Sequence, residues 1–209
     1  MTLALMQFAV VAGLMTLVPG LDFTMILRTA LTQSKRVAFA AGAGICLGLF
    51  VWALAAAAGL SAVLAASESA FTLLRLTGAA YMIYLGAMFI WHSRHPQVAT
   101  ESDAVSAESA ITTFWRGVLT NILNPKIGAF YIAMLPPFIP ADTNVALAGL
   151  ALGAVHVIES MLYFTAIILA ANFFKSQFSR PRFRAWLDRV AGVLIIGFGL
   201  RLLTASSPS

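Results

Sequence analysis

Long apolar stretches separated by short polar breaks run through most of the chain. Each of six stretches is long enough for a helix that crosses about 30 Å of hydrocarbon, which takes about 20 residues. They cover residues 3–27, 37–66, 70–91, 114–139, 145–173 and 182–204. Glycine, proline and alanine are frequent within them, and the period-two alternation typical of barrel strands is absent. The pattern therefore predicts an all-α integral membrane protein with six transmembrane helices.

The composition supports this class of protein. Of the 209 residues, 60% are hydrophobic and only 10% are charged, whereas a soluble domain normally carries about 25% charged residues. So few charges could not cover a water-facing surface, which excludes an ordinary soluble enzyme. The single cysteine, Cys46, lies within an apolar stretch. It excludes an internal disulfide and a cysteine-based zinc site.

The distribution of bases predicts the orientation in the membrane. If six helices alternate in direction, only Arg75 and Arg201 lie on one side, and ten bases lie on the other. The ten are Arg28, Lys35, Arg36, Arg94, Arg116, Lys175, Arg180, Arg182, Arg184 and Arg189. Basic loops stay in the cytoplasm. We therefore expect both termini on the outer, periplasmic side.

A polar stretch over residues 92–113 divides the chain into two units of three helices each, 1–91 and 114–209. We interpret this stretch as a cytoplasmic linker, because it is rich in serine, alanine and glutamate and interrupts the apolar pattern.

The two units resemble one another, which indicates an internal duplication. Phe8 and Pro19 recur 106 positions later as Phe114 and Pro125. Two glycine pairs also correspond, and we expect both to permit close helix contact. They are Gly44-xxx-Gly48 and Gly149-xxx-Gly153. Because each unit has an odd number of helices, the two repeats must be inverted relative to each other, as in many secondary transporters.

Prolines interrupt the first and fourth apolar stretches at corresponding positions. Pro19, followed by Gly20, lies inside the first stretch, and Pro125 lies inside the fourth. Proline removes a backbone donor and clashes with the preceding turn, so both helices are expected to break there. Paired broken helices point to a transport site near the membrane midplane. The free N–H groups at the start of each second half favour an anion such as a carboxylate.

Two charged residues accompany these breaks. Asp22 follows the first and Lys126 the second, although a charge near the bilayer centre costs about 2.5–3.5 kcal/mol on insertion scales. One interpretation is a structural Asp22–Lys126 ion pair that ties the two halves together. The other is a site for a zwitterion, with Lys126 for a carboxylate and Asp22 for an ammonium group or a proton. Asn121 and Asn124 share a face of the fourth stretch and are expected to belong to this substrate-binding cavity.

The fifth stretch contains a second acid. Glu159 is, with Asp22, a candidate for proton coupling, because acids inside a membrane are usually functional. The alternative is a protonated Glu159 that is hydrogen-bonded to His156 or Tyr163. His156 lies three residues earlier on the same helix face and is a candidate for lining the cavity. These two residues alone are too few ligands for a metal ion, so no metal and no cofactor are expected.

Two further features carry weaker expectations. Tyr81 and Tyr84 in the third stretch are candidates for cavity lining, although helix packing, with each hydroxyl bonded to a backbone carbonyl, is the favoured explanation. The segment 173–186 mixes bases with aromatic residues. Beside a membrane-spanning helix, such a segment is typical of an interfacial anchor that is drawn to anionic lipid headgroups, and we expect no nucleic-acid partner.

Five short motifs occur in the order found in a known family. They are Val18-Pro19-Gly20-x-Asp22-Phe23, Gly42-x-Gly44-Ile45-x-x-Gly48, Gly78-Ala79-Ala80-Tyr81-x-x-Tyr84-Leu85-Gly86, Phe114-x-x-Gly117-x-x-x-Asn121-x-x-Asn124-Pro125-Lys126 and Leu135-Pro136-x-Phe138. Together they resemble the lysine-exporter (LysE/RhtB) family of amino-acid efflux transporters. One departure is Leu21, where that family usually carries a second proline. The resemblance implies a bacterial inner-membrane exporter of amino acids or close derivatives, such as homoserine, threonine, leucine or lysine, that uses the proton gradient.

The resulting hypothesis is a multi-pass secondary transporter that works by alternating access with proton antiport, and not an enzyme. Its partners are an amino-acid substrate, protons and the lipid bilayer. A divalent-cation exporter of the same superfamily is an alternative. A membrane-embedded enzyme is a weaker one, because the spans hold no recognisable nucleophile–base pair. The sequence leaves open the cargo, the proton stoichiometry and whether the protein forms a homo-oligomer.

Overall fold

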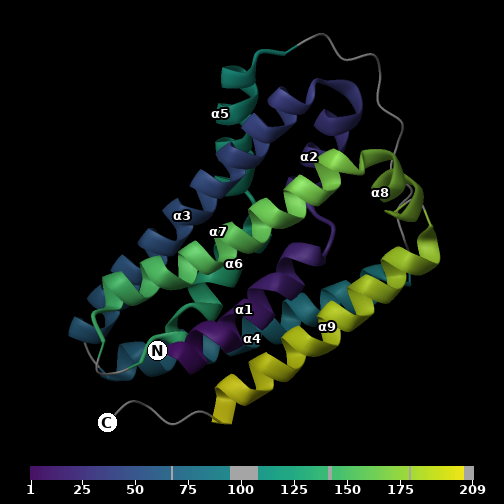
Figure 1. Cartoon of the computed structure of the whole chain (residues 1–209). Helices are drawn as coiled ribbons and strands as arrows, with labels where there is room; N and C mark the ends of the chain where they lie inside the picture. Colours follow the sequence, from purple (N-terminus) through teal and green to yellow (C-terminus); the bar gives the residue numbers. More distant parts are fainter. Residues whose placement is uncertain (67, 95–107, 141–142, 179, 205–209) are drawn as a thin grey trace.

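The computed structural model describes residues 1–66, 68–94, 108–140, 143–178 and 180–204 (Figure 1). Within these ranges the regular secondary structure is entirely helical. The elements are α1 (Thr2–Leu17), α2 (Leu21–Thr32), α3 (Lys35–Ala66), α4 (Glu68–His92), α5 (Ala110–Ile122), α6 (Pro125–Met134), the short 3-10 helix η1 (Pro136–Phe138), α7 (Val145–Leu169), α8 (Ala171–Phe178) and α9 (Pro181–Thr204). The prediction of an all-α fold is confirmed for the described residues.

The apolar stretches correspond to these helices, with three differences at their ends. The first stretch was expected to end at residue 27, but α2 continues to Thr32. The fourth stretch was expected to begin at residue 114, but α5 begins at Ala110 because the Ser109 side chain accepts a hydrogen bond from the backbone N–H of Thr112. The fifth was expected to continue to residue 173, but α7 ends at Leu169 and a separate helix, α8, follows. Most of the expected linker, residues 95–107, lies outside the described residues.

Two helices in the described part of the chain are long and apolar enough to cross a membrane. They are the Lys35–Gly59 part of α3 and the whole of α7, Val145–Leu169. A third span results if α1 and α2, which are bent by 56° at the break between them, count as one. A further apolar stretch of helix, Leu76–Trp91 within α4, is shorter.

Small residues bring the central helices into close contact. A Cβ atom at Gly44 of α3 would overlap the carbonyl oxygen of Phe114 on α5. On the other side of α3, Cβ atoms at Gly149 and Gly153 of α7 would lie 2.5 and 2.6 Å from the Cβ atoms of Ala57 and Ala53. The expectation that these glycines permit close helix packing is therefore confirmed for α3 with α5 and with α7.

The helices α4 and α9 form a second closely packed pair along the lower edge of Figure 1. A Cβ atom at Gly86 would lie 2.6 Å from the carbonyl oxygen of Gly192, and a Cβ atom at Gly192 would lie 2.6 Å from that of Gly86. Near one end of the pair, Arg189 Nε donates to Ser93 Oγ at 3.1 Å. Near the other, Gly199 packs against Ala79. The two helices therefore run antiparallel and meet through corresponding residues.

Candidate functional site

Two interrupted helices meet in the middle of the molecule. The first helix ends at Leu17 and restarts at Leu21, with Pro19 and Gly20 in the break. The second ends at Ile122 and restarts at Pro125. Asn124 caps this restart, because its side-chain oxygen accepts a hydrogen bond from the backbone N–H of Lys126 at 3.1 Å. An asparagine N-cap followed by proline at the first helical position is a favourable start for a helix.

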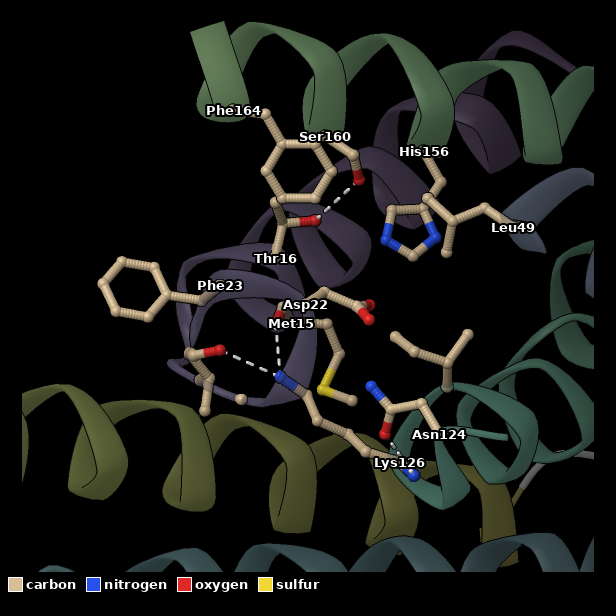
Figure 2. Close-up of a pocket in the computed structure, with 13 residues that line it drawn as sticks. Met15, Thr16, Asp22, Phe23, Leu49, Asn124, Lys126, His156, Ser160 and Phe164 are labelled. Atoms are coloured by element: carbon tan, nitrogen blue, oxygen red, sulfur yellow. Dashed lines mark hydrogen bonds between the residues drawn. The ribbon is translucent and has the colours of Figure 1, made fainter. Parts of the chain in front are cut away.

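Lys126 binds the end of the broken helix of the other unit. Its Nζ atom donates hydrogen bonds to the carbonyl oxygens of Met15 at 3.0 Å and Val18 at 2.9 Å (Figure 2). In a continuous helix, the carbonyl of Met15 would accept from the N–H of residue 19, but Pro19 has no N–H. The ammonium group therefore satisfies a carbonyl that the proline leaves without its usual donor. It also places a positive charge at the negative end of the α1 dipole.

Asp22 lies in the first turn of α2, where a carboxylate interacts favourably with the helix dipole. Its Oδ2 atom accepts a hydrogen bond from Nδ2 of Asn121 at 2.9 Å, and the Asn124 side chain points toward the carboxylate (Figure 2). The second oxygen, Oδ1, is buried and has no hydrogen-bond partner. The same is true of Oδ1 of Asn121. The site therefore holds two buried acceptor oxygens without a donor.

The Asp22–Lys126 ion pair, which was one of the two interpretations of these charges, is not formed in this structure. Asp22 and Lys126 instead each bind the first half of the interrupted helix of the opposite unit, Asp22 through Asn121 and Lys126 through two backbone carbonyls. The two breaks are thus linked reciprocally, without direct contact between the charges.

A small cavity lies between the two breaks and α7 (Figure 2). Its polar lining includes four predicted site residues, and its apolar lining comes mainly from α1, α2, α3 and α7. The polar residues are Thr16, Asp22, Asn124, Lys126, His156 and Ser160. The cavity volume is about 20 Å³, room for little more than one water molecule. Asn121 does not line this cavity; it is fully buried behind Asp22.

The sequence did not point to Thr16, Ser160 or Trp52. The hydroxyl oxygens of Thr16 and Ser160 lie 3.5 Å apart across the cavity. Trp52 Nε1 donates to the backbone carbonyl of Asn121 at 3.4 Å, which fixes the last turn of α5. In sequence, Thr16 stands one turn before Pro19, which is a weak signal. Nothing local distinguishes Ser160 or Trp52 from other residues of their type.

The polar residues of α7 differ in their surroundings. His156 is buried beside the cavity, and its Nδ1 atom lies 3.0 Å from the hydroxyl oxygen of Tyr131 on α6. Glu159 lies against Gly13 of α1. Its Oε2 atom is buried and has no hydrogen-bond partner, and neither has the hydroxyl of Tyr163. The alternative in which Glu159 is hydrogen-bonded to His156 or Tyr163 is therefore not realised here.

The two tyrosines of α4 do not reach this cavity. Tyr81 lines a separate, smaller and apolar cavity, together with residues of α1, α6 and α9. Tyr84 lines neither cavity, because its side chain is 59% exposed on the outside of the helix. The two rings contact each other, with centroids 6.0 Å apart. In the described part of the chain, no group of three or more histidine, cysteine, aspartate or glutamate side chains lies close enough together to hold a metal ion.

Comparisons with known proteins point to one family. A family model for the LysE type translocator matches residues 14–206. The chain is 28% identical over 188 residues to the threonine efflux protein of Escherichia coli, which covers 88% of this chain and 90% of that protein. It is 26% identical over 197 residues to the leucine efflux protein of an Enterobacter species, with 93% and 92% of the two chains covered.

A membrane protein of Bacillus subtilis without an assigned function is 28% identical over 204 residues, which covers 95% of this chain and 97% of that protein. No solved structure matches the chain.

Proposed function

We propose that this chain, which belongs to the LysE type translocator family, exports an amino acid or a close derivative across a bacterial inner membrane. The observation that carries the proposal is the cavity between two broken helices, lined by a lysine ammonium and by an aspartate with a free buried oxygen. The names of the threonine and leucine efflux proteins support a small amino acid as the cargo.

The site matches the two charges of a zwitterion. Asp22 Oδ1 is a buried acceptor without a donor, and a substrate ammonium group would supply that donor. The Lys126 ammonium group donates hydrogen bonds to two backbone carbonyls in the present structure. A substrate carboxylate would form a stronger, charge-assisted hydrogen bond with the ammonium group than a neutral carbonyl does. In the proposed complex, the carboxylate therefore takes Lys126 away from Met15 and Val18.

This exchange of partners connects binding to movement. When Lys126 leaves the end of α1, the break between α1 and α2 loses the donor that holds it in its present shape. The cavity of about 20 Å³ is far too small for an amino acid, so the substrate can be accommodated only if the helices around it separate. We propose that α1 and α6 move apart at this point and expose the site to one side of the membrane, as alternating access requires.

The helix packing supports two inverted repeats. Gly86 and Gly192, which are 106 positions apart, make the same contact with each other's helix, and α4 and α9 run antiparallel. Along α3 and α7, Ala57 contacts Gly149 while Cys46 contacts Val157. This pair is therefore antiparallel as well, as expected of repeats with opposite orientation in the membrane.

The arrangement of the chain ends supports the predicted orientation. In Figure 1, the N-terminus and the far end of α9 lie at the same end of the molecule, whereas α8 and the start of α9 lie at the other. An even number of spans would place both termini on one side. Basic segments stay in the cytoplasm. Because they lie at the end of the molecule opposite to the two termini, both termini would be periplasmic.

Proton antiport would supply the driving force. Asp22 and Glu159 are the candidates, since each has a buried carboxylate oxygen without a hydrogen-bond donor. Protonation would give such an oxygen a hydrogen to donate and would remove the cost of an unpaired buried charge. Glu159 lies against α1, so a change in its charge would act on the helix that carries the first break.

The cavity fits a divalent-cation cargo less well than an amino acid. Lys126 places a positive charge in the same small space, and like charges repel strongly where the effective dielectric constant is low.

The test is export from cells loaded with radiolabelled amino acids, in a strain that lacks its own threonine and leucine exporters. Expression of the chain should increase the efflux of at least one amino acid. Lys126→Met, inserted in the membrane at the same level, should give no increase. Equal efflux from both strains, for every amino acid tested, would refute the proposal.

A further inference from the structure

The helix α8 has no counterpart in the first half of the chain. It lies between α7 and α9, whereas in the first half α4 begins at Glu68 directly after α3 ends at Ala66. Figure 1 shows α8 and the start of α9 at the end of the molecule where α2 also ends. An element that is present in only one of two similar halves is not needed for the shared fold, so it is a candidate for a function of its own.

One face of α8 packs directly on the half-helix that carries Asp22. The ring of Phe178 lies 4.3 Å from that of Phe23, measured between centroids, and Phe23 is the residue after Asp22. Phe174 contacts Tyr163 of α7, with centroids 6.1 Å apart. These rings form one aromatic cluster with Phe183 at the start of α9. A displacement of α8 would therefore be transmitted to the first turn of α2.

The other face of α8 and the start of α9 expose both bases and aromatic side chains. Arg180 lies just before α9 and Arg182 lies in its first turn, and both are exposed. The backbone N–H of Phe183 donates to the carbonyl of Arg180, which closes this first turn. Phe173 on α8 is 60% exposed, and Trp186 on α9 is 58% exposed. Exposed aromatic rings beside bases fit the headgroup level of a membrane, where rings contact lipid and bases contact phosphate.

We propose that Arg180 and Arg182 bind the headgroup of an anionic phospholipid, and that the bound lipid stabilises the position of α2 through the Phe178–Phe23 contact. The second half of this statement rests on the proposed transport function, and the first half does not. The two positive charges suit a lipid with a net negative headgroup better than a zwitterionic one. The bound lipid keeps α8 against α2 and so keeps Asp22 in its binding position.

The lipid site is tested by fluorescence. The full-length chain is reconstituted into phosphatidylcholine vesicles that contain phosphatidylglycerol as a minor component, with bromine on the acyl chains of one lipid or the other. Trp186 reports on its neighbours, because bromine quenches tryptophan on contact, and Trp186→Phe identifies its share of the signal. Brominated phosphatidylglycerol should quench Trp186 more strongly than expected from its fraction of the lipid in the vesicle. The preference should weaken about fivefold for each base removed.

Two pairs of substitutions decide whether the site is specific. Arg180→Gln with Arg182→Gln should abolish the preference. Lys35→Gln with Arg36→Gln removes two exposed bases from the start of α3, at the same end of the molecule, and should leave the preference unchanged. Equal quenching by both lipids in the wild-type chain would overturn the proposed site, and so would equal loss in both pairs.

The coupling to α2 is tested by substrate affinity. The substrate KM for export should be lower in vesicles with phosphatidylglycerol than without it. Phe178→Leu, which keeps an apolar side chain but removes the ring, should abolish this difference while the quenching preference remains. A KM that responds to the lipid equally in wild type and Phe178→Leu would overturn the coupling. If the chain exports no amino acid at all, the proposed transport function fails, while the quenching result still decides the lipid site.

Discussion

The close contact between Gly48 and Asn121 allows a sharp test of the site geometry. Gly48 lies on α3 opposite the last turn of α5, and a Cβ atom added there would lie 2.6 Å from Oδ1 and 2.8 Å from Cβ of Asn121. Both distances are below any normal van der Waals contact, and Asn121 is fully buried. Gly48→Ala must therefore displace Asn121, which would break its hydrogen bond to Asp22.

The expected cost of Gly48→Ala follows from three terms. Overpacking a well-packed interior costs about 1–3 kcal/mol. Loss of a hydrogen bond to a charged group costs about 1.5–3 kcal/mol. Alanine in place of glycine within a helix stabilises the fold by about 1 kcal/mol. We therefore expect the free energy of unfolding to fall by about 1.5–5 kcal/mol, together with a large loss of export, since Asp22 loses the donor that positions it.

Gly59→Ala is the matched control for this substitution. Gly59 lies on the same helix, but no atom lies within 4 Å of the position that its Cβ would take. This variant should keep wild-type export and should be as stable as the wild type or slightly more stable. The measurements are thermal unfolding of the purified proteins in detergent and efflux from loaded cells. If Gly48→Ala behaved like Gly59→Ala in both, Asn121 would not lie where the structure places it.

Three further predictions concern the charges and the α4–α9 contact. The double variant Asp22→Asn/Lys126→Met should insert and fold, because removing both charges together leaves no buried charge unpaired. It should not export. Glu159→Gln should still exchange substrate across a vesicle membrane, but a pH gradient should no longer drive net transport if Glu159 carries the proton. Gly192→Val should lower the unfolding temperature, because a Cβ atom there would lie 2.6 Å from the carbonyl oxygen of the facing helix. Gly197→Val, with open space around it, should not.

Each of these predictions has an outcome that contradicts it. Export by the doubly neutral variant would make the Asp22–Lys126 pair structural and not part of the binding site. Gradient-driven transport by Glu159→Gln at the wild-type rate would leave Asp22 as the proton-coupling candidate. Equal unfolding temperatures for the two glycine variants would show that α4 and α9 are not in the close contact described.

Local patterns in the sequence were sufficient to predict much of this protein. Hydrophobic runs and a low share of charge predicted an all-helical protein of the membrane class, because both are properties of neighbouring residues. Pro19 and Pro125 predicted where two helices are interrupted, since the chemistry of proline acts on its own turn. The short motifs around them predicted the family, and the family model confirmed it. The inverted repeat, the orientation and the roles of the site residues stay predictions.

Contacts between helices were beyond the reach of these patterns. The partners of Lys126 are an example. One of the two interpretations of the sequence paired it with Asp22, whereas the tertiary structure pairs the ammonium group with the carbonyls of Met15 and Val18. Which partner a long side chain reaches depends on the rotation and register of two helices. Those are set by packing all along their contact and not by the residues at the break.

The same reason explains the other differences. Tyr81 and Tyr84 are only three positions apart, yet the rotation of α4 brings Tyr81 into contact with its neighbours and leaves Tyr84 exposed. The short helix α8 was expected only as a basic and aromatic anchor, and its contact with Phe23 exists only because α2 is packed beside it. The sequence by itself determined the class of protein, the family and the helix breaks, because these depend on local chemistry. Only the tertiary structure decided which groups meet, because that depends on how whole helices pack against one another.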